Sequence, residues 1–515
     1  MKKFILAVST LCLGILVNAQ AQGLDLKPKT AEAVTMMERS ALWFSTSNAA
    51  ALAVDTLAQY GTLEMRYNGG SGDLRKQQTA QSFNDVSFYT DGAAKIGGFR
   101  LWGDFEFQNN FEKGSRYNTI LYEVFEDMPY YAVDTAASGW TKQAYLMSAK
   151  VSSPVLWDHV SFGLGVRYDT KVGAKQKDPR CEVYKYDVSV FPSVAAVFGS
   201  NTVGLYGVYT HGFERSVPGN ENYRKSQMVF LSKGLGEGIL TKVGDNDGLK
   251  TCYYKANTFG GGLQYGYKGG FNLLADLGFT MTKQVGEQNP MLPKSLGNIE
   301  RINVTADVRA EFGSERQHSV GLQGLLRSTN GIELLQSLST EAFNQSWVTI
   351  GENAMTLFNY VDAGLSYDFF GGRNAATGYS WNAGADLAFT MRDYSYSLPE
   401  ATLDASSLLA TVRGAKQLTF SETTLLLGAK AGYNVGLGGE YIYNNGTKTQ
   451  WLQDFYRSDL VFFTDSYLIA GLTVGSSFPL GSRIRGTACA DASYATVLGE
   501  SRSRILANIS FGIVF

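Results

Sequence analysis

Residues 301–312 have the sequence RINVTADVRAEF, in which polar and apolar side chains alternate at every position. Successive side chains of a β-strand point to opposite faces, so this stretch predicts a strand with one polar and one apolar face. Residues 99–108, FRLWGDFEFQ, show the same alternation, as do residues 161–169, 379–392 and 483–496. Strands of this two-faced kind therefore recur along the chain.

The length of the alternating stretches separates two fold classes. Strands of a soluble sandwich usually have about 5–6 residues, whereas about 9–11 tilted residues are needed to cross a membrane. Here the alternation often lasts about ten residues, and eighteen such segments can be placed, with sixteen or fourteen as alternatives. The sequence predicts an all-β fold, a transmembrane antiparallel up-and-down β-barrel of about 18 strands.

The connections between these segments support the membrane alternative, because short and long ones alternate. The short ones include residues 199–201, 267–270, 313–316 and 479–482, and the long ones are residues 111–139, 214–251, 330–354 and 437–463. Bacterial outer-membrane barrels have short periplasmic turns and long extracellular loops. An even number of strands would also place both ends of the barrel in the periplasm.

The N-terminus carries an export signal. Lys2 and Lys3 precede an apolar stretch at residues 4–17, and Ala19-Gln20-Ala21 follows as a small-x-small cleavage motif. This combination predicts a cleaved secretory signal peptide over residues 1–21.

Residues 22–57 come between this signal and the barrel, which is expected to occupy residues 58–515. They form either an N-terminal periplasmic segment or a small hatch inside the lumen, and both alternatives stay open. The segment is too short to be the folded plug domain of an energy-coupled receptor.

The C-terminus carries a second localisation signal. Phe511, Ile513 and Phe515 alternate with other residues up to the end of the chain. A last strand that ends in Phe resembles the signal read by the outer-membrane assembly machinery. Together with the export signal, it predicts a protein of the cell outer membrane, with membrane lipid and the barrel-assembly machinery as partners.

The composition excludes several functional classes. The chain has 515 residues, of which 18% are charged and 13% aromatic, with a net charge of −2. A nucleic-acid partner is not expected, because that requires a basic patch or a high pI. Only His159, His211 and His318 are present, far apart in the sequence. We therefore expect no enzyme activity, no catalytic residue, no metal site and no cofactor.

The polar faces of the predicted strands carry basic and acidic side chains in equal number. Rings of one sign would indicate a selective pore, so the balance predicts either a weakly selective channel or an interior closed by salt bridges. The candidate lumen charges are Arg100, Asp104, Glu106, Arg167, Asp169, Asp307, Arg309, Asp386, Arg392, Arg483 and Arg485.

Two predicted outer loops contain candidate sites. Pro129 and Asp134 lie in one, and Asp178 and Arg180 in another. Either the loops fold over the mouth with Asp134 or Asp178 paired to Arg180, or Asp and Pro simply set the turns. Cys181 and Cys252 both begin strands after outer loops, and the exported compartment permits a disulfide between them. Both states, bonded and free, stay open.

Several segments resemble an uncharacterised family of outer-membrane β-barrels from the Bacteroidota. The segments are residues 43–52, Pro129-Tyr130 with Asp134, Lys175 with Asp178-Pro179-Arg180, residues 97–103, and Tyr145. The resemblance implies a barrel in the outer membrane that is associated with nutrient or metal uptake. Asn48-Ala49-Ala50 is also similar to the hatch of fatty-acid-transporter-like barrels, with Ala where those barrels usually have Pro.

Two functions follow from these observations. The first is a passive channel or transporter component for a small solute, in which loops select and the lumen conducts. The second is a plugged accessory barrel that partners a surface lipoprotein or a nutrient-uptake receptor. An open pore would distinguish the first from the second.

Overall fold

The computed structural model describes residues 30–55, 57–121, 128–222, 224–243, 248–340, 345–373, 377–444, 450–482 and 484–515. The predicted signal peptide, residues 1–21, lies outside the described residues. The strands of the main sheet are β1 Tyr60–Gly72, β2 Ser82–Ile96, β3 Phe99–Ser115, β5 Ser138–Ser152, β6 Val160–Lys175, β7 Arg180–Phe198, β8 Asn201–Gly219, β11 Cys252–Lys268, β12 Asn272–Gln288, β13 Lys294–Phe312, β14 Arg316–Ser339, β15 Ser346–Gly371, β16 Trp381–Tyr396, β17 Ala401–Phe420, β18 Thr423–Tyr443, β19 Tyr467–Pro479, β20 Arg485–Val497 and β21 Ser503–Val514.

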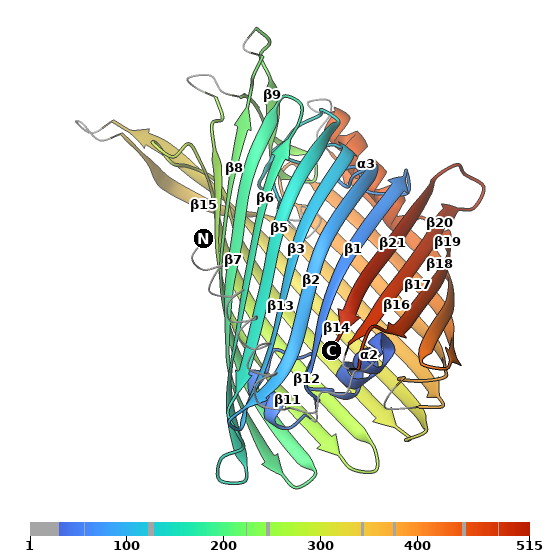
Figure 1. Cartoon of the computed structure of the whole chain (residues 1–515). Coiled ribbons are helices and arrows are strands. Elements are labelled where there is room, and N and C mark those ends of the chain that lie inside the picture. Colours follow the sequence, from blue (N-terminus) through green and yellow to red (C-terminus); the bar gives the residue numbers. More distant parts are fainter. Residues whose placement is uncertain are drawn as a thin grey trace.

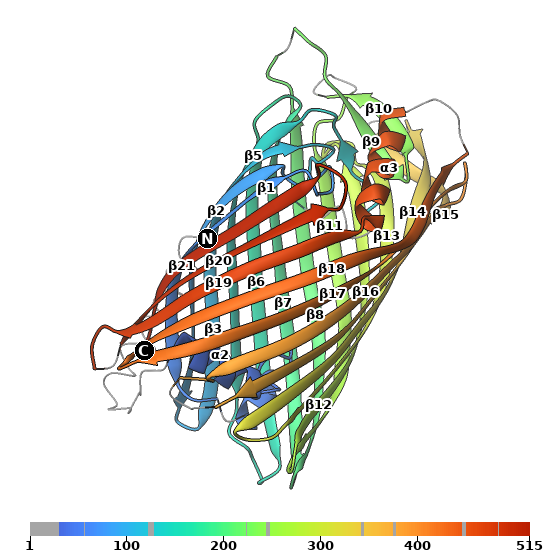
Figure 2. The same cartoon turned by 90° about the vertical axis from the view of Figure 1, so that its right-hand side faces the viewer.

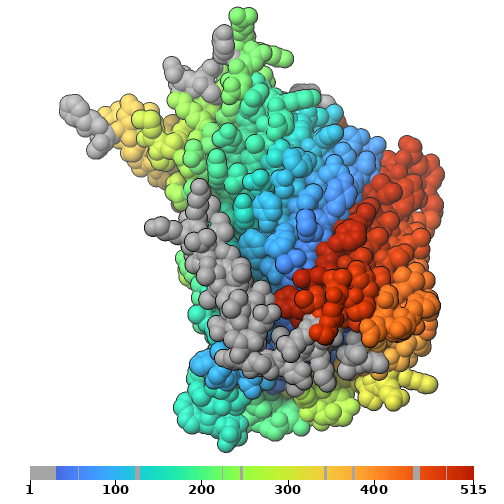
Figure 3. All heavy atoms as spheres, viewed as in Figure 1, coloured from blue at the N-terminus to red at the C-terminus, as the bar shows by residue number. Residues whose placement is uncertain are grey.

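These strands form a closed antiparallel β-barrel of 18 strands, as the sequence predicted. Each strand pairs with the next one along the chain, and β1 closes the sheet by pairing with β21, with Met65 opposite Phe511. Figures 1 and 2 show the tilted strands, and Figure 3 shows the blue first strands directly against the red last ones. None of the described helices is long and apolar enough to cross a membrane.

The two faces of the wall differ as the alternation predicted. Large apolar side chains are exposed on the outer face, including Leu263, Leu277, Leu322, Val412, Leu472 and Phe511. The alternate positions point into the barrel and carry most of the charged residues. The last residue, Phe515, continues the outward set and its backbone bonds to Gly61 at the seam.

At the end of the barrel opposite the short turns, the long connections are more structured than the loops that the sequence predicted. Residues 330–354 were predicted as a loop, yet most of them extend β14 and β15 into a long hairpin whose pairing continues to Ser339 and Ser346. The hairpin projects beyond the barrel in Figure 1. The ladder continues because antiparallel pairing needs only two neighbouring strands and not a membrane.

The other long connections contain secondary structure of their own. Residues 214–251 include β9 Met228–Gly234 and β10 Glu237–Lys242, and residues 111–139 include β4 Ala132–Val133. These three form a small separate sheet in the order β10-β9-β4. Helix α3, Gln450–Thr464, lies between β18 and β19.

The N-terminal segment, residues 30–55, folds into two short helices. Helix α2, Ala31–Ser40, begins at Thr30, whose side chain accepts a hydrogen bond from the Ala33 N–H as helix caps do. The 3-10 helix η1, Ala49–Ala53, is capped in the same way by Asn48, which accepts from the Ala51 N–H. Figures 1 and 2 both place α2 at the short-turn end of the barrel.

Candidate functional site in the barrel lumen

Helix η1 is bound to the inner wall through its backbone. Ser152 and Ser161, from β5 and β6, each donate a hydrogen bond of 2.9 Å to the carbonyl of Ala50. The Ala50 N–H donates to Ser193 Oγ on β7 at 3.0 Å. Each of these serines lies on the inward-pointing set of its strand. Three neighbouring strands therefore hold one turn of the N-terminal segment inside the barrel.

Inward-facing glycines make room for this turn. A Cβ on Gly163 would lie 2.1 Å from the Ala50 nitrogen, and one on Gly266 would lie 2.6 Å from the Trp43 ring. Ala49, Ala50 and Ala51 are fully buried as a result. The close approach of backbone to backbone requires glycine on the wall and alanine on the helix.

Charged side chains tie the same segment to the wall. Lys150 on β5 donates to the carbonyls of Phe44 and Thr46 at 2.8 and 2.7 Å. Across the lumen, Arg39 pairs with Asp368 on β15, and Asp368 also accepts from Arg413 on β17 at 2.7 Å. The N-terminal segment thus contacts opposite sides of the barrel.

Burial raises the pKa values of three carboxyl groups of the segment, those of Glu32, Glu38 and Asp55, the last two to about 7. The Tyr60 hydroxyl lies 2.5 Å from Glu38 Oε1 and 2.7 Å from Asp91 Oδ2. Burial, with Asp91 nearby, raises the pKa of Glu38 to about 7. Burial also raises the pKa of Asp55 to about 7, although Lys268 and Arg100 oppose the shift. One hydroxyl proton cannot serve two carboxylates, so a protonated Glu38 completes this hydrogen-bonded group.

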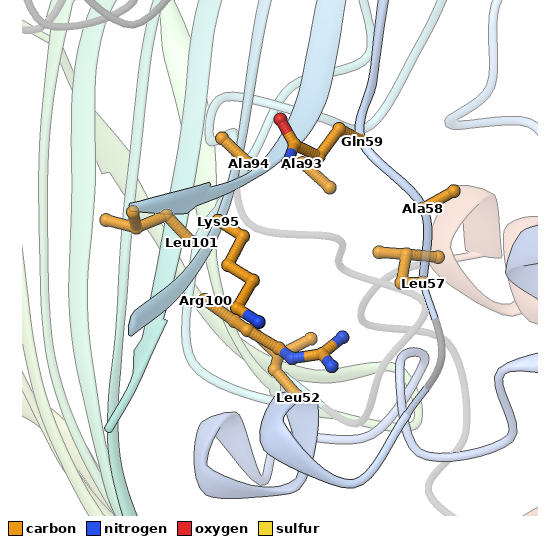
Figure 4. Close-up of a pocket in the computed structure, with 9 residues that line it drawn as sticks. All are labelled: Leu52, Leu57, Ala58, Gln59, Ala93, Ala94, Lys95, Arg100 and Leu101. Carbon is orange, nitrogen blue, oxygen red and sulfur yellow. The ribbon is translucent and has the colours of Figure 1, made fainter. Parts of the chain in front are cut away.

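A cavity of about 220 Å³ separates part of the segment from the wall. Figure 4 shows Lys95 and Arg100 extending into it, with Leu52 and Leu57 of the N-terminal stretch on the other side. Arg100, a predicted lumen charge, donates to the Asp55 carbonyl at 2.7 Å.

The opposite end of the lumen contains a loop cap, which we define as residues 117–121, residues 128–134 (which include β4), β9, β10 and α3. Tyr130, Phe230 and Phe455 of the cap pack with the inward-facing Tyr254 and Ile299 in one buried apolar cluster. A second cluster packs Leu235 against inward-facing residues of β15, β16 and β17. This end of the inner wall is therefore apolar, unlike the charged middle.

A buried ion pair fixes the cap. Lys175 Nζ lies 2.5 Å from Asp134 Oδ2, and both side chains are fully shielded from solvent. Burial raises the pKa of Asp134 and the charge of Lys175 lowers it. Glu214, fully buried on β8, accepts from the Leu121 N–H at 2.9 Å. Both contacts join residues that are far apart in the chain.

The predicted loop residues fall into two different places. Asp134 is buried in the cap with Lys175, whereas Arg180 pairs with Asp178 at 2.9 Å on the surface. Pro129 lies beside Tyr130 in the cap and its Cβ is 3.3 Å from the position a Cβ on Gly234 would take. Of the two predicted pairings, that of Asp178 with Arg180 is formed, whereas that of Asp134 with Arg180 is wrong, because Lys175 takes that place.

Cys181 and Cys252 are free, buried thiols, so the disulfide is not formed in this structure. Cys181 pairs with Pro218 and Cys252 with Ser216, both on β8, which lies between them. Neighbouring strands are about 4.8 Å apart, so two strand spacings exceed the roughly 7 Å that a disulfide can bridge between Cα atoms.

The predicted lumen charges mostly pair within or between neighbouring strands. Arg167 lies 2.8 Å from Asp169, Arg309 lies 2.8 Å from Asp307, and Arg413 pairs with Asp386. Arg392 instead stacks on Phe463 of the cap, with 4.1 Å to the ring centroid. Arg485 bonds to Ser477 Oγ at 3.3 Å. Asp104 and Glu106 lie on the same inward face, and Arg483 lies outside the described residues.

Sequence reasoning missed the residues that receive the N-terminal segment. Ser161, Gly163 and Gly165 form a run of small inward positions, which differs from the charged inward positions further along the same strand. That local change to small side chains was the available signal. Glu214 and Lys150 were missed as anchors because their partners lie in distant segments.

Comparison with known proteins gives a family and several likenesses. A model described as "Family of unknown function (DUF6850)" matches residues 49–515. No curated protein matches the chain. The structure is similar to the outer membrane transporter YddB from Escherichia coli, at 6% identity and a TM-score of 0.40, covering 88% of this chain and 80% of that one.

Two further solved structures are similar. The ferric preacinetobactin receptor BauA from Acinetobacter baumannii has 11% identity and a TM-score of 0.38, with 88% of this chain and 80% of that one covered. A TodX mutant, described as a monoaromatic hydrocarbon channel, has 11% identity and a TM-score of 0.31, with 91% and 92% covered. At these scores, nothing about a ligand of this chain follows.

Proposed function

We propose that this chain, which belongs to the family of unknown function DUF6850, is an outer-membrane barrel that passes a small solute through its lumen. The N-terminal segment, residues 30–55, acts in this proposal as a hatch at the periplasmic mouth. The observation that carries the proposal is the seat of η1 on inward-facing serines and glycines of β5, β6 and β7.

The outer face supports a membrane location. Its exposed apolar residues form a band around a closed barrel, and closure leaves no unpaired strand edge facing lipid. Trp157 is 76% exposed at a short turn, and Trp381, at the same end, is 43% exposed. Aromatic residues of this kind anchor barrels at the lipid interface. Insertion by the barrel-assembly machinery through the last strand is part of the proposal.

The contacts that hold residues 30–55 against the wall are of a kind that allows this segment to be displaced. Many of them are hydrogen bonds and ion pairs, which water can replace, so the net stability of each is small. The apolar contacts are limited to two small clusters, Leu42 and Trp43 with Leu274, and Val34 with Tyr60 and Val514. A hydrogen bond to water substitutes for one to Ser152 or Lys150 when the segment leaves. An eighteen-stranded barrel is wide enough to hold an aqueous channel once the segment is displaced.

Single-channel conductance in a planar lipid bilayer tests the proposal. The refolded chain, residues 22–515, is compared with a version that lacks residues 22–57. We expect larger or more frequent ohmic steps without the segment. If neither version conducts, and heat-modifiable migration on gels shows that both are folded, the proposed channel function is wrong.

A second function is favoured by the apolar packing of the loop cap. A cap with a buried core of its own is typical of a permanent closure, as a plugged accessory barrel would have. Such a barrel would act as the partner of a surface lipoprotein or nutrient-uptake receptor. Silence in both bilayer experiments would favour this function.

A further inference from the structure

A polar cavity of about 420 Å³ lies between the inner wall and the loop cap. Its wall side is formed by inward-facing residues of β3, β5 and β6, among them Gln108, Asn110 and Lys142. Its other side is formed by Gln78 and by Ile120 of the cap. Small-molecule sites usually have volumes of about 300–1,000 Å³, so this cavity is large enough for one small solute.

The side-chain oxygens of two amides in the lining lack hydrogen-bond partners. Gln78 is only 4% exposed, and its side-chain carbonyl oxygen has no hydrogen-bond partner. The side-chain oxygen of Asn110 is buried and has none either. An unpaired buried polar atom costs about 1–3 kcal/mol. A rotation of either side chain that brings its oxygen to a hydrogen-bond donor of a ligand in the cavity recovers part of that cost.

Two of the three charged side chains in the lining form an ion pair, and the third, Lys171, lies on β6. Lys142 Nζ lies 2.7 Å from Glu112 Oε1, and these side chains are 26% and 15% exposed. A zwitterionic or ionic solute would have to break this pair to be bound by it. An uncharged solute can hydrogen-bond to the outer atoms of both groups and leave the pair intact.

We propose that this cavity binds a small, uncharged, hydroxyl-rich solute, a mono- or disaccharide. A hydroxyl donates a hydrogen bond to the unpaired oxygen of Gln78 or Asn110, and it still accepts one from another polar group of the lining. Ile120 and Leu121 present an apolar surface to the C–H face of such a ring. This inference rests on the proposed function in one respect: a solute must be able to enter the lumen. It adds the chemical class of that solute.

Titration calorimetry of the refolded chain, residues 22–515, with maltose tests the inference. The detergent is lauryldimethylamine oxide, since a maltoside would compete. We expect saturable heat with maltose and none with glycylglycine, a zwitterion of similar polarity. Gln78→Met and Asn110→Leu, which keep the side-chain volume, should each weaken maltose binding by roughly 3- to 10-fold.

A matched control uses an amide outside the cavity. Gln417 on β17 points inward, is 5% exposed and also has an unpaired side-chain atom. Gln417→Met should therefore leave maltose binding unchanged. Heat-modifiable migration on gels verifies that all three variants are folded, and equal loss of binding in all three would overturn the assignment.

The outcomes separate this inference from the channel. Maltose binding without conductance supports the saccharide site while the channel proposal fails. Conductance without maltose binding by the folded chain overturns the saccharide site and leaves the channel. Saturable binding of glycylglycine in place of maltose also overturns it, because the Glu112–Lys142 pair would then be the recognition element.

Discussion

The two ends of the lumen are closed by different kinds of contact. At the short-turn end, the N-terminal segment is held by serine hydroxyls, Lys150, glycine-alanine contacts and two small apolar clusters. At the opposite end, the loop cap buries tyrosine, phenylalanine and aliphatic side chains in two clusters. Both ends lie in the same barrel, so the difference comes from the residues and not from the fold class.

This difference in contacts indicates which end of the lumen opens more easily. Apolar burial contributes about 25 cal/mol per Å² and is lost when the cap leaves the wall. A hydrogen bond exchanged for one to water contributes only about 0.5–1.5 kcal/mol. The apolar clusters of the N-terminal segment are smaller than those of the cap, so this is the end we expect to be displaced. Four changes test this contrast.

The largest effect is expected from the buried pair of the cap. Lys175→Ala leaves the Asp134 carboxyl buried without its partner, which should destabilise the cap by about 3–5 kcal/mol. Hydrogen exchange of residues 117–121 and 128–134 measures the local opening. The double variant Asp134→Asn with Lys175→Met is the control, and it should lose much less. Unchanged protection in Lys175→Ala would show that the apolar clusters alone hold the cap.

The next largest effect is expected at Gly163, the glycine of β6 that η1 contacts. Gly163→Ala places a Cβ 2.1 Å from the Ala50 nitrogen, so η1 must shift. Overpacking of this kind costs about 1–3 kcal/mol, and the barrel should conduct more often in a planar bilayer. Gly165→Ala, on the same strand and face, is the matched control, since its Cβ meets only the Phe191 side chain at 3.3 Å. Equal conductance of the two variants would contradict the claim that the close contact between Gly163 and Ala50 holds η1 against the wall.

A smaller effect is expected from pH. The pKa values of Glu38 and Asp55 are raised to about 7 in the docked segment, so docking binds protons. The stabilisation is complete below the ordinary carboxyl pKa of about 4 and is lost as pH rises to about 7. Channel openings should therefore become more frequent as the pH rises from about 5 to about 7.5.

The control for pH is the double variant Glu38→Gln with Asp55→Asn, which removes the two carboxyl groups whose pKa is raised to about 7 and leaves Glu32. Its openings should vary less with pH than those of the unchanged chain. If the frequency of openings in the unchanged chain rose more steeply with pH than expected, or fell, groups other than these two carboxyls would control the docking of the N-terminal segment.

The smallest effect is expected at the surface pair of the outer loops. Arg180 is 47% exposed in its pair with Asp178, and exposed pairs contribute about 0.2–1 kcal/mol. Asp178→Asn should leave hydrogen exchange of the cap nearly unchanged, in contrast to Lys175→Ala. A loss as large as that of Lys175→Ala would remove the distinction between the buried and the exposed pair.

Much of the wall could be predicted because its pattern is local. Alternation gave the strands and their faces, and pairs such as Asp307 with Arg309 join residues two positions apart on one strand. The extent of the β14–β15 hairpin was not predicted, because alternation weakens where both faces meet water. The cap was assigned to loops because its apolar residues are dispersed over several connections.

The sequence by itself determined a closed barrel with an apolar outer face and a charge-balanced inner face, since two-residue periodicity fixes which side chains point outward. The tertiary structure decided which distant residues meet: Arg39 with Asp368, Asp134 with Lys175, and Ala50 with three serines. It also separated Cys181 from Cys252 by one strand. The physical reason is that barrel closure and the folding-in of loops, rather than neighbouring positions in the chain, set these distances.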